Sequence, residues 1–305
     1  MELPALAVWA WIPIVVWAAL AQTVRNATQR TLVTEIGTLA ATLVRFLYGL
    51  PFAMVWLALI CQRSTMATAL PPASLAYGAW LFLGAAAQLA ATALLLLAMK
   101  QRNFIVGVTF SKTEVLQVGV FAAIMLGELP SLASAIAMAI ATLGVVLLSL
   151  PPKKEAGIWN GNAAWLGLGS GACFALSSVG YRGAALEFGA ASAWLIGAWA
   201  VLLAQLAQSV LLGAWLAWRQ PGSLAAIARA WKLSALAGMM GALASIGWLT
   251  AMALRPAAEV RTLGLLEVLF SYLVSRRLFK EQLSRNERAG LLLVGAGVLV
   301  VGAQW

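Results

Sequence analysis

The stretch FIVGVTFSKTEVLQVGVFAAIML, residues 104–126, decides the fold, because it is a long apolar run that carries Lys112 and Glu114 near its middle. A helix needs about 20 mostly apolar residues to cross a hydrocarbon core of about 30 Å. Similar runs predict ten transmembrane helices, over residues 6–28, 36–60, 75–98, 104–126, 132–150, 162–181, 191–217, 233–253, 257–278 and 288–304. We therefore expect an all-α membrane protein whose short loops leave no room for a soluble catalytic domain.

The composition excludes several kinds of chemistry. Of 305 residues, 63% are hydrophobic and 10% are charged, against about 25% charged in soluble domains. All 10 acidic residues are Glu, and the chain has no His, so histidine metal centres and aspartyl-phosphate chemistry are excluded. Cys61 and Cys173 lie in apolar runs without the spacing of a metal site. We expect neither an enzyme nor a bound metal or cofactor.

The chain repeats itself at an offset of about half its length. Shifting it by about 153 residues, as expected for a duplicated chain, aligns Glu114-Val115-Leu116 with Glu267-Val268-Leu269 and Glu128 with Glu281. We predict two repeats, residues 1–152 and 153–305, with five helices each. Because five is odd, the second repeat enters the membrane inverted. Inverted repeats place a substrate site near the midplane, so the sequence predicts a 5+5 arrangement around a central cavity.

The basic residues predict the orientation. Seventeen Lys and Arg lie in loops or at helix ends, and of these only Arg63, Arg182 and Arg255 follow even-numbered helices. The positive-inside rule places the other fourteen in the cytoplasm and both termini outside. Contact with anionic membrane lipid accounts for the net charge of +10, so we expect no nucleic-acid partner.

The end of each half resembles a known family. Gly127-Glu128-Leu129-Pro130 leads into the apolar run 141–148, and Lys280-Glu281-Gln282-Leu283 leads into 293–301. This pattern resembles the EamA-type ten-helix exporters of the drug/metabolite transporter superfamily, in which a Glu ends the fourth helix of each repeat. With its length and 14 Trp, the chain looks most like the aromatic amino acid exporters. Glu128 and Glu281 precede helix starts, where we expect them to act as structural caps.

Five charged residues are singled out because they fall well inside predicted spans: Arg45, Lys112, Glu114, Arg261 and Glu267. Charges at membrane depth are costly, so they usually face a cavity or each other. We expect Glu114 and Glu267 to bind an ammonium group, and Lys112, Arg261 or Arg45 a carboxylate. The alternatives are an ion pair for each glutamate, Glu267 with Arg261 or Glu114 with Arg45, and snorkelling for the two arginines.

Uncharged site candidates come from the resemblance. Trp17, Tyr181 and Trp248 fall in helices 1, 6 and 8, which line the cavity in that family, and Gln88 lies in helix 3. The aromatic rings would stack on a flat substrate, although packing or lipid-facing roles fit them equally well. GxxxG at Gly167 to Gly171 and the pair Gly238 and Gly241 are typical of close helix packing.

These features favour a secondary transporter that exports small metabolites, with aromatic amino acids preferred. The alternative is a multidrug or organic-cation exporter, which would use the glutamates and need little from Lys112 or Arg261. We expect an integral protein of a bacterial inner membrane that works as a monomer and contacts only its small-molecule substrate and lipid.

The orientation is directly testable. A reporter enzyme that works only in the cytoplasm is expected to be inactive when fused after Trp305, because the basic loops hold the C-terminus outside. If this fusion is active and a fusion in the loop near Lys153 is inactive, the predicted orientation is wrong and both termini lie in the cytoplasm.

Overall fold

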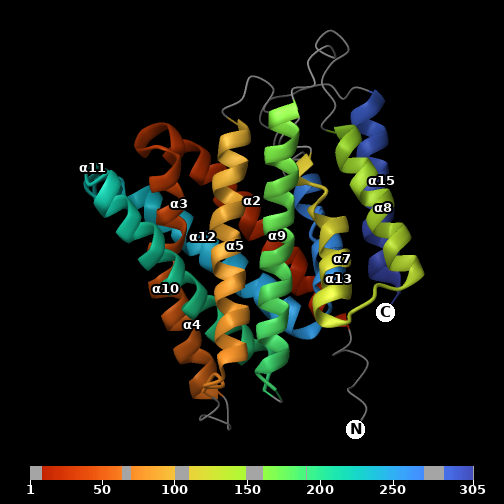
Figure 1. Cartoon of the computed structure of the whole chain (residues 1–305), viewed down its shortest axis with the longest axis horizontal. Coiled ribbons are helices and arrows are strands. Elements are labelled where there is room, and N and C mark those ends of the chain that lie inside the picture. Colours follow the sequence, from red (N-terminus) through yellow and green to blue (C-terminus); the bar gives the residue numbers. More distant parts are fainter. Residues whose placement is uncertain are drawn as a thin grey trace. The chain divides into compact units, whose positions relative to one another are not determined.

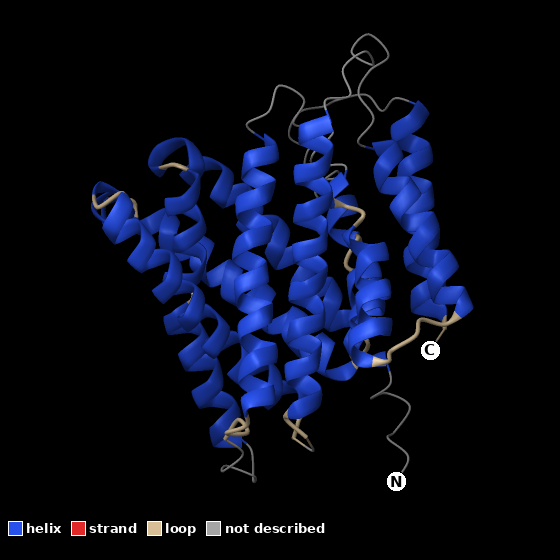
Figure 2. Cartoon of the chain, in the orientation of Figure 1, coloured by secondary structure: helices blue, strands red, loops and turns tan. Residues whose placement is uncertain are grey.

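The computed structural model of the chain is helical throughout the part that it describes, residues 9–63, 70–99, 110–148, 161–189, 191–270 and 285–304, and those residues form no strand (Figure 2). The helices, labelled in Figure 1, are α2 (Trp11–Ile36), α3 (Thr38–Leu47), α4 (Leu50–Arg63), α5 (Leu75–Met99), α7 (Glu114–Leu126), α8 (Leu132–Leu148), α9 (Gly161–Glu187), α10 (Ala193–Arg219), α11 (Gly222–Arg229), α12 (Trp231–Leu254), α13 (Ala257–Leu263) and α15 (Arg285–Ala303).

Six of the described helical segments are long and apolar enough to cross a membrane, by length and composition. They are α3 together with α4, and α5, α9, α10, α12 and α15. The apolar helices α7 and α8 are shorter. These lengths suggest an integral membrane protein.

The helix boundaries differ from the predicted spans in several places, three of which lie outside the candidate site described below. α2 continues to Ile36 rather than ending near residue 28, and it takes in Arg25, Arg30 and Glu35. The predicted span 36–60 is broken between α3 and α4, where Gly49 N–H donates to the carbonyl of Phe46 at 3.1 Å. α11 was not predicted; it begins after Pro221, whose fixed φ suits a helix start.

The chain forms two compact units, and each draws on both halves of the sequence. Unit 1 comprises Met1–Ile12, Ala87–Val179 and Pro256–Trp305, and unit 2 comprises Pro13–Ala86 and Gly180–Arg255. In unit 1, α15 packs along α8 (Figure 1). At one end of this pair, the hydroxyls of Ser131 and Ser134 each donate to Gln304 Oε1 at 2.9 Å.

Glycines let the backbones of α8 and α15 touch. A Cβ at Gly144 would lie 2.7 Å from the carbonyl oxygen of Gly290 and 2.7 Å from the nitrogen of Val294. A Cβ at Gly297 would lie 2.7 Å from the carbonyl oxygen of Ala137 and 3.0 Å from the nitrogen of Ala141. The two contacts are related by the same shift of about 153 residues as the sequence repeat, so α8 and α15 pack reciprocally through equivalent positions.

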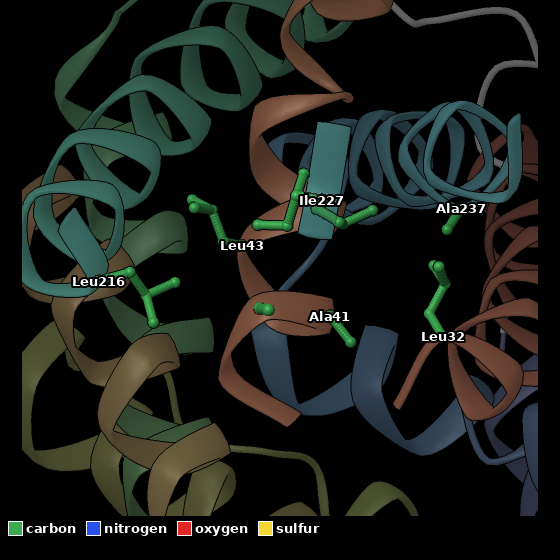
Figure 3. Packing of buried hydrophobic residues seen from close by; sticks show 8 residues of the cluster. Leu32, Ala41, Leu43, Leu216, Ile227 and Ala237 are labelled. Atoms are coloured by element: carbon green, nitrogen blue, oxygen red, sulfur yellow. The ribbon is translucent and has the colours of Figure 1, made fainter. Parts of the chain in front are cut away.

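Unit 2 is built on α3, α4, α10, α11 and α12. α10 contacts α12, α4 and α3, and α12 contacts α3. The buried side chains of Leu43, Leu216 and Ile227 meet in a core that also includes Leu32 of α2 and Ala237 of α12 (Figure 3). This core holds the C-terminal half of α2 against α3 and α12.

The reciprocal glycine contact generates a stability prediction. Gly297→Leu is expected to destabilise the protein by about 1 to 3 kcal/mol or more, because the side chain would have to displace the α8 backbone. The measurement is thermal unfolding in detergent. Gly295→Leu, two residues away with no atom within 4 Å of a Cβ, is the matched control and should unfold like the parent. Equal melting temperatures for the two variants would contradict the close packing.

Candidate charged site at two helix breaks

The helix that carries Glu114 is interrupted just before this residue. Phe110 and Ser111 are helical, Lys112 and Thr113 form a turn, and α7 begins at Glu114. Thr113 N–H donates to the carbonyl of Phe110 at 3.2 Å, and its hydroxyl donates to the same oxygen at 2.6 Å. A threonine hydroxyl that bonds to the local backbone competes with regular helical bonding, which accounts for a break at this polar point of an apolar run.

The chain around Glu267 has a matching break. α13 ends at Leu263, Gly264 and Leu265 form a turn, and residues 266–270 are helical again. Glu267 N–H donates to the carbonyl of Gly264 at 3.0 Å. The two turns lie near equivalent positions of the sequence repeat. Glu114 comes directly after the first turn, and Glu267 comes two residues after the second. Irregular backbone at membrane depth occurs where it is buried in protein or lines a water-filled cavity.

An ion pair joins the two broken segments within unit 1. Arg261 Nη2 of α13 donates to Glu114 Oε1 of α7, with side-chain exposures of 21% and 10%. Two ionised groups out of water need this mutual attraction to offset their lost hydration. The sequence had suggested ion pairs as an alternative to substrate binding, but with other partners: Arg261 with Glu267, and Glu114 with Arg45.

Polar groups and a close helix contact surround the ion pair. Gln117 Nε2 donates to the hydroxyl of Thr113 at 2.8 Å. A Cβ at Gly171 of α9 would lie 2.9 Å from the carbonyl oxygen of Ser111 and 3.3 Å from the nitrogen of Glu114. The sequence predicted close packing at this glycine, and the structure confirms it. α9 thus supports the turn that presents Glu114.

Sequence reasoning missed a third acid in this region. Glu259 of α13 is buried, with 7% of its surface exposed, two residues before Arg261. The repeat search could not find it, because its counterpart at the same offset is Val106. The sequence feature that could have revealed Glu259 is its position, as a charged residue, within the predicted span 257–278. Lys112 and Glu267 are both half-buried.

The remaining predicted site residues are divided between the two units. Gln88 of α5 belongs to unit 1, and its carbonyl accepts from the hydroxyl of Thr92 at 2.9 Å. Arg45, Trp17, Tyr181 and Trp248 all belong to unit 2. The ion pair brings Glu114 and Arg261, two of the nine predicted residues, into direct contact.

The aromatic candidates differ in exposure. Trp17 is 52% exposed, whereas Tyr181 and Trp248 are buried. The Tyr181 ring packs on Gly84, where a Cβ would lie 2.7 Å from its Cδ1, and its hydroxyl accepts from Gln208 Nε2 at 3.3 Å. Trp248 Nε1 donates to Gln22 Oε1 at 2.9 Å. Both buried rings are thus fixed by specific contacts.

Arg25 lies in a different setting from the one expected. The sequence placed it at the cytoplasmic flank of the first helix, but it lies well inside α2 and is only 6% exposed. Its Nη2 and Nε donate to Asn26 Oδ1 at 2.7 and 3.2 Å. The helix continues through this region because α2 packs on α3, as shown by the bond from Gln29 Nε2 to the carbonyl of Ala41 at 2.9 Å.

The family motifs are described only in part. Gly127 ends α7 with a left-handed φ of 69°, and Glu128 N–H donates to the carbonyl of Ala122 at 3.2 Å. Ser131 caps α8 by accepting from Ser134 N–H at 3.0 Å. Glu281 and Ser284 lie outside the described residues. The capping roles of Glu128 and Glu281 remain predictions.

Comparisons with known proteins identify the fold but no family. No protein-family profile matches the sequence. No curated protein matches it either. Eighteen chains of solved structures match its fold. One of them, described only as "Crystal structure of protein", aligns with a TM-score of 0.72 over 95% of this chain and 96% of that chain, at 15% identity. At this identity the likeness establishes a shared fold alone.

The ion pair generates a double-mutant prediction. Glu114→Gln and Arg261→Gln are each expected to lower the melting temperature in detergent, because each leaves a buried charge without its counter-charge. The double variant should recover part of the loss, with a coupling free energy of about 1 to 3 kcal/mol. Glu187→Gln, at an exposed carboxylate, is the control. Purely additive effects would show that the pair does not stabilise the fold.

Proposed function

We propose that the protein is a secondary transporter that exports small metabolites, with amino acids and especially aromatic ones preferred, by alternating access. The observation that carries this proposal is the ion pair between Glu114 and Arg261, located where two helical segments are interrupted. Transporter sites are typically formed at broken helices, where free backbone groups and charged side chains meet the substrate. The protein would use this point to bind a zwitterion.

The chemistry of binding would be an exchange of partners. A substrate ammonium group would take the place of Arg261 beside Glu114, and the substrate carboxylate would take the place of Glu114 beside Arg261. The internal pair would re-form on release, so neither charge is left without a counter-charge in an apolar environment. Glu267 and Lys112, both half-buried beside the breaks, would supply further charge of each sign.

An inverted repeat of five plus five helices would provide the alternating movement. The matching helix breaks and the reciprocal contact of α8 with α15 support it, since both recur at the sequence offset of about 153 residues. Within this proposal the chain resembles the EamA-type exporters, lies in a bacterial inner membrane with periplasmic termini, and works as a monomer without a cofactor.

An organic-cation exporter is the second candidate. It is favoured by the number of acids near the breaks: Glu114 and Glu259 are buried and Glu267 is half-buried. This part of unit 1 thus holds three carboxylates and two cations, Arg261 and Lys112. The excess of negative charge would attract positively charged ligands. Such a protein would bind cations without requiring a substrate carboxylate.

Counterflow in proteoliposomes separates the two candidates. We expect labelled phenylalanine and tryptophan to exchange in the parent protein, and Glu267→Gln to reduce this exchange about tenfold with normal folding, since one charge-assisted contact is worth about 1.5 to 3 kcal/mol. Lys112→Met should reduce amino acid exchange more than exchange of tetramethylammonium. Exchange of cations alone would support the second candidate, and parent rates in both variants would contradict the zwitterion site.

A further inference from the structure

The connection between α10 and α12, which contains α11, gathers positive charge. The sequence has no acidic residue between Glu187 and Glu259, and Arg219, Arg229 and Lys232 lie within this acid-free stretch. The three basic side chains are exposed, and all belong to unit 2. They lie in the last turn of α10, the last turn of α11 and the first turn of α12. Since α11 has only 8 residues, or about 12 Å of helix, the three charges share a small part of the surface.

Two of these cations lie over exposed tryptophan rings. Cζ of Arg219 is 4.1 Å from the ring centroid of Trp218, and Nζ of Lys232 is 5.8 Å from that of Trp231. Both distances are within the reach of a cation–π interaction, about 6 Å. Trp218 is 73% exposed and Trp231 is 56% exposed. Because tryptophan favours the headgroup level of a bilayer, each ring would hold its cation near the depth of the lipid phosphates.

The helix α11 has one face buried in unit 2 and one face exposed. Ile227 lies in the core shown in Figure 3, and its carbonyl accepts from the hydroxyl of Tyr48 at 3.5 Å. Leu224 and Arg229 are exposed. Contacts with α3, α10 and α12 fix the helix in place. Apolar and cationic residues together on the outer face of a helix are typical of helices that lie in the membrane interface.

One acid lies on an element that shares the core with α11. Glu35 follows the core residue Leu32 by about one turn of α2, and it is exposed. Even with this carboxylate counted, three basic residues stand against one acid. The surface around α11 therefore has the charge that complements an anion.

We propose that Arg219, Arg229 and Lys232, here called the α11 basic patch, bind the phosphate of an anionic phospholipid such as phosphatidylglycerol. Guanidinium groups bond phosphate oxygens in pairs, and the lysine ammonium acts as a point charge. The predicted orientation places the patch on the cytoplasmic side, where the membrane surface is negative. This inference concerns the surrounding membrane and does not depend on the proposed function.

Amide hydrogen exchange of residues 222–229 measures binding at α11 directly, because a short surface helix opens easily unless it is held. The full chain is placed in nanodiscs of phosphatidylcholine, with and without phosphatidylglycerol. We expect phosphatidylglycerol to slow this exchange by at least about tenfold in the parent protein, since each basic residue of the patch adds to the attraction. The ratio of the two rates is compared within each variant, so that a change in the intrinsic stability of α11 cancels.

Single charge removals test the patch. Arg219→Gln, Arg229→Gln and Lys232→Gln should each reduce the effect of phosphatidylglycerol by about fivefold, as expected for one charge at an anionic surface. Arg288→Gln removes the same charge from an exposed position of α15 in unit 1. This matched control should leave the ratio at α11 unchanged.

A second pair of variants tests the tryptophan. Trp218→Leu retains every charge but removes the ring beneath Arg219, so the guanidinium is less ordered and the effect of phosphatidylglycerol should fall. Trp165→Leu changes a similarly exposed tryptophan of α9, with 71% of its surface exposed. It should behave like the parent protein.

Several results would overturn the proposal. Equal exchange rates in the two lipid mixtures would show that the tryptophans make only the contacts of an ordinary interfacial belt. Parent-like ratios in all three charge variants would show that the patch does not bind the phosphate. Glycerol 3-phosphate that slows exchange as strongly in phosphatidylcholine nanodiscs would assign the patch to a soluble phosphate. Loss of the effect in the patch variants but not in Arg288→Gln supports the lipid site, whatever counterflow shows about transport.

Discussion

Neutralising buried charge is the constraint on which unit 1 depends. Arg261 and Glu114 come from segments far apart in the sequence, and each would be costly in an apolar environment without the other. Their attraction therefore requires α7 and α13 to be neighbours, as they are. The backbone near both residues departs from a continuous helix, and short-range bonds at both turns supply hydrogen-bond partners there.

Small residues make these polar features sterically compatible with close packing. Gly171 lets α9 lie against the turn before Glu114, and Gly241 leaves room for the stems of Arg25 and Arg45. Where a hydrophobic driving force between helices is weak, as in lipid, backbone approach of this kind supplies van der Waals contact instead. In both places a glycine on one helix faces polar backbone or the stem of a charged side chain on another, so the same glycines permit close packing and leave room for these groups.

Much of the helical pattern could be predicted from the sequence, because long apolar runs have few alternatives in a membrane. The C-terminal end of α2 could not be predicted, because the polar stretch after residue 28 has the composition of a loop, whereas in the structure α2 continues through it and contacts α3 and α12. The repeat located Glu114 but not its partner, since Arg261 has no counterpart of similar charge at the repeat offset. Glu259 was missed for the same reason. Arg261 and Glu114 are 147 residues apart. Their pairing depends on the tertiary structure and cannot be read from the sequence around either residue.

The contact between α8 and α15 also bears on how the protein assembles. α8 ends at Leu148 and α15 begins at Arg285, so α8 is synthesised well before the backbone that packs on its glycine face. Contacts between residues far apart in sequence carry a large loop-closure cost and form late in folding. Unit 1 therefore closes only after α15 has been synthesised, and until then the Gly144 face of α8 is open to association with other small-residue helices in the membrane.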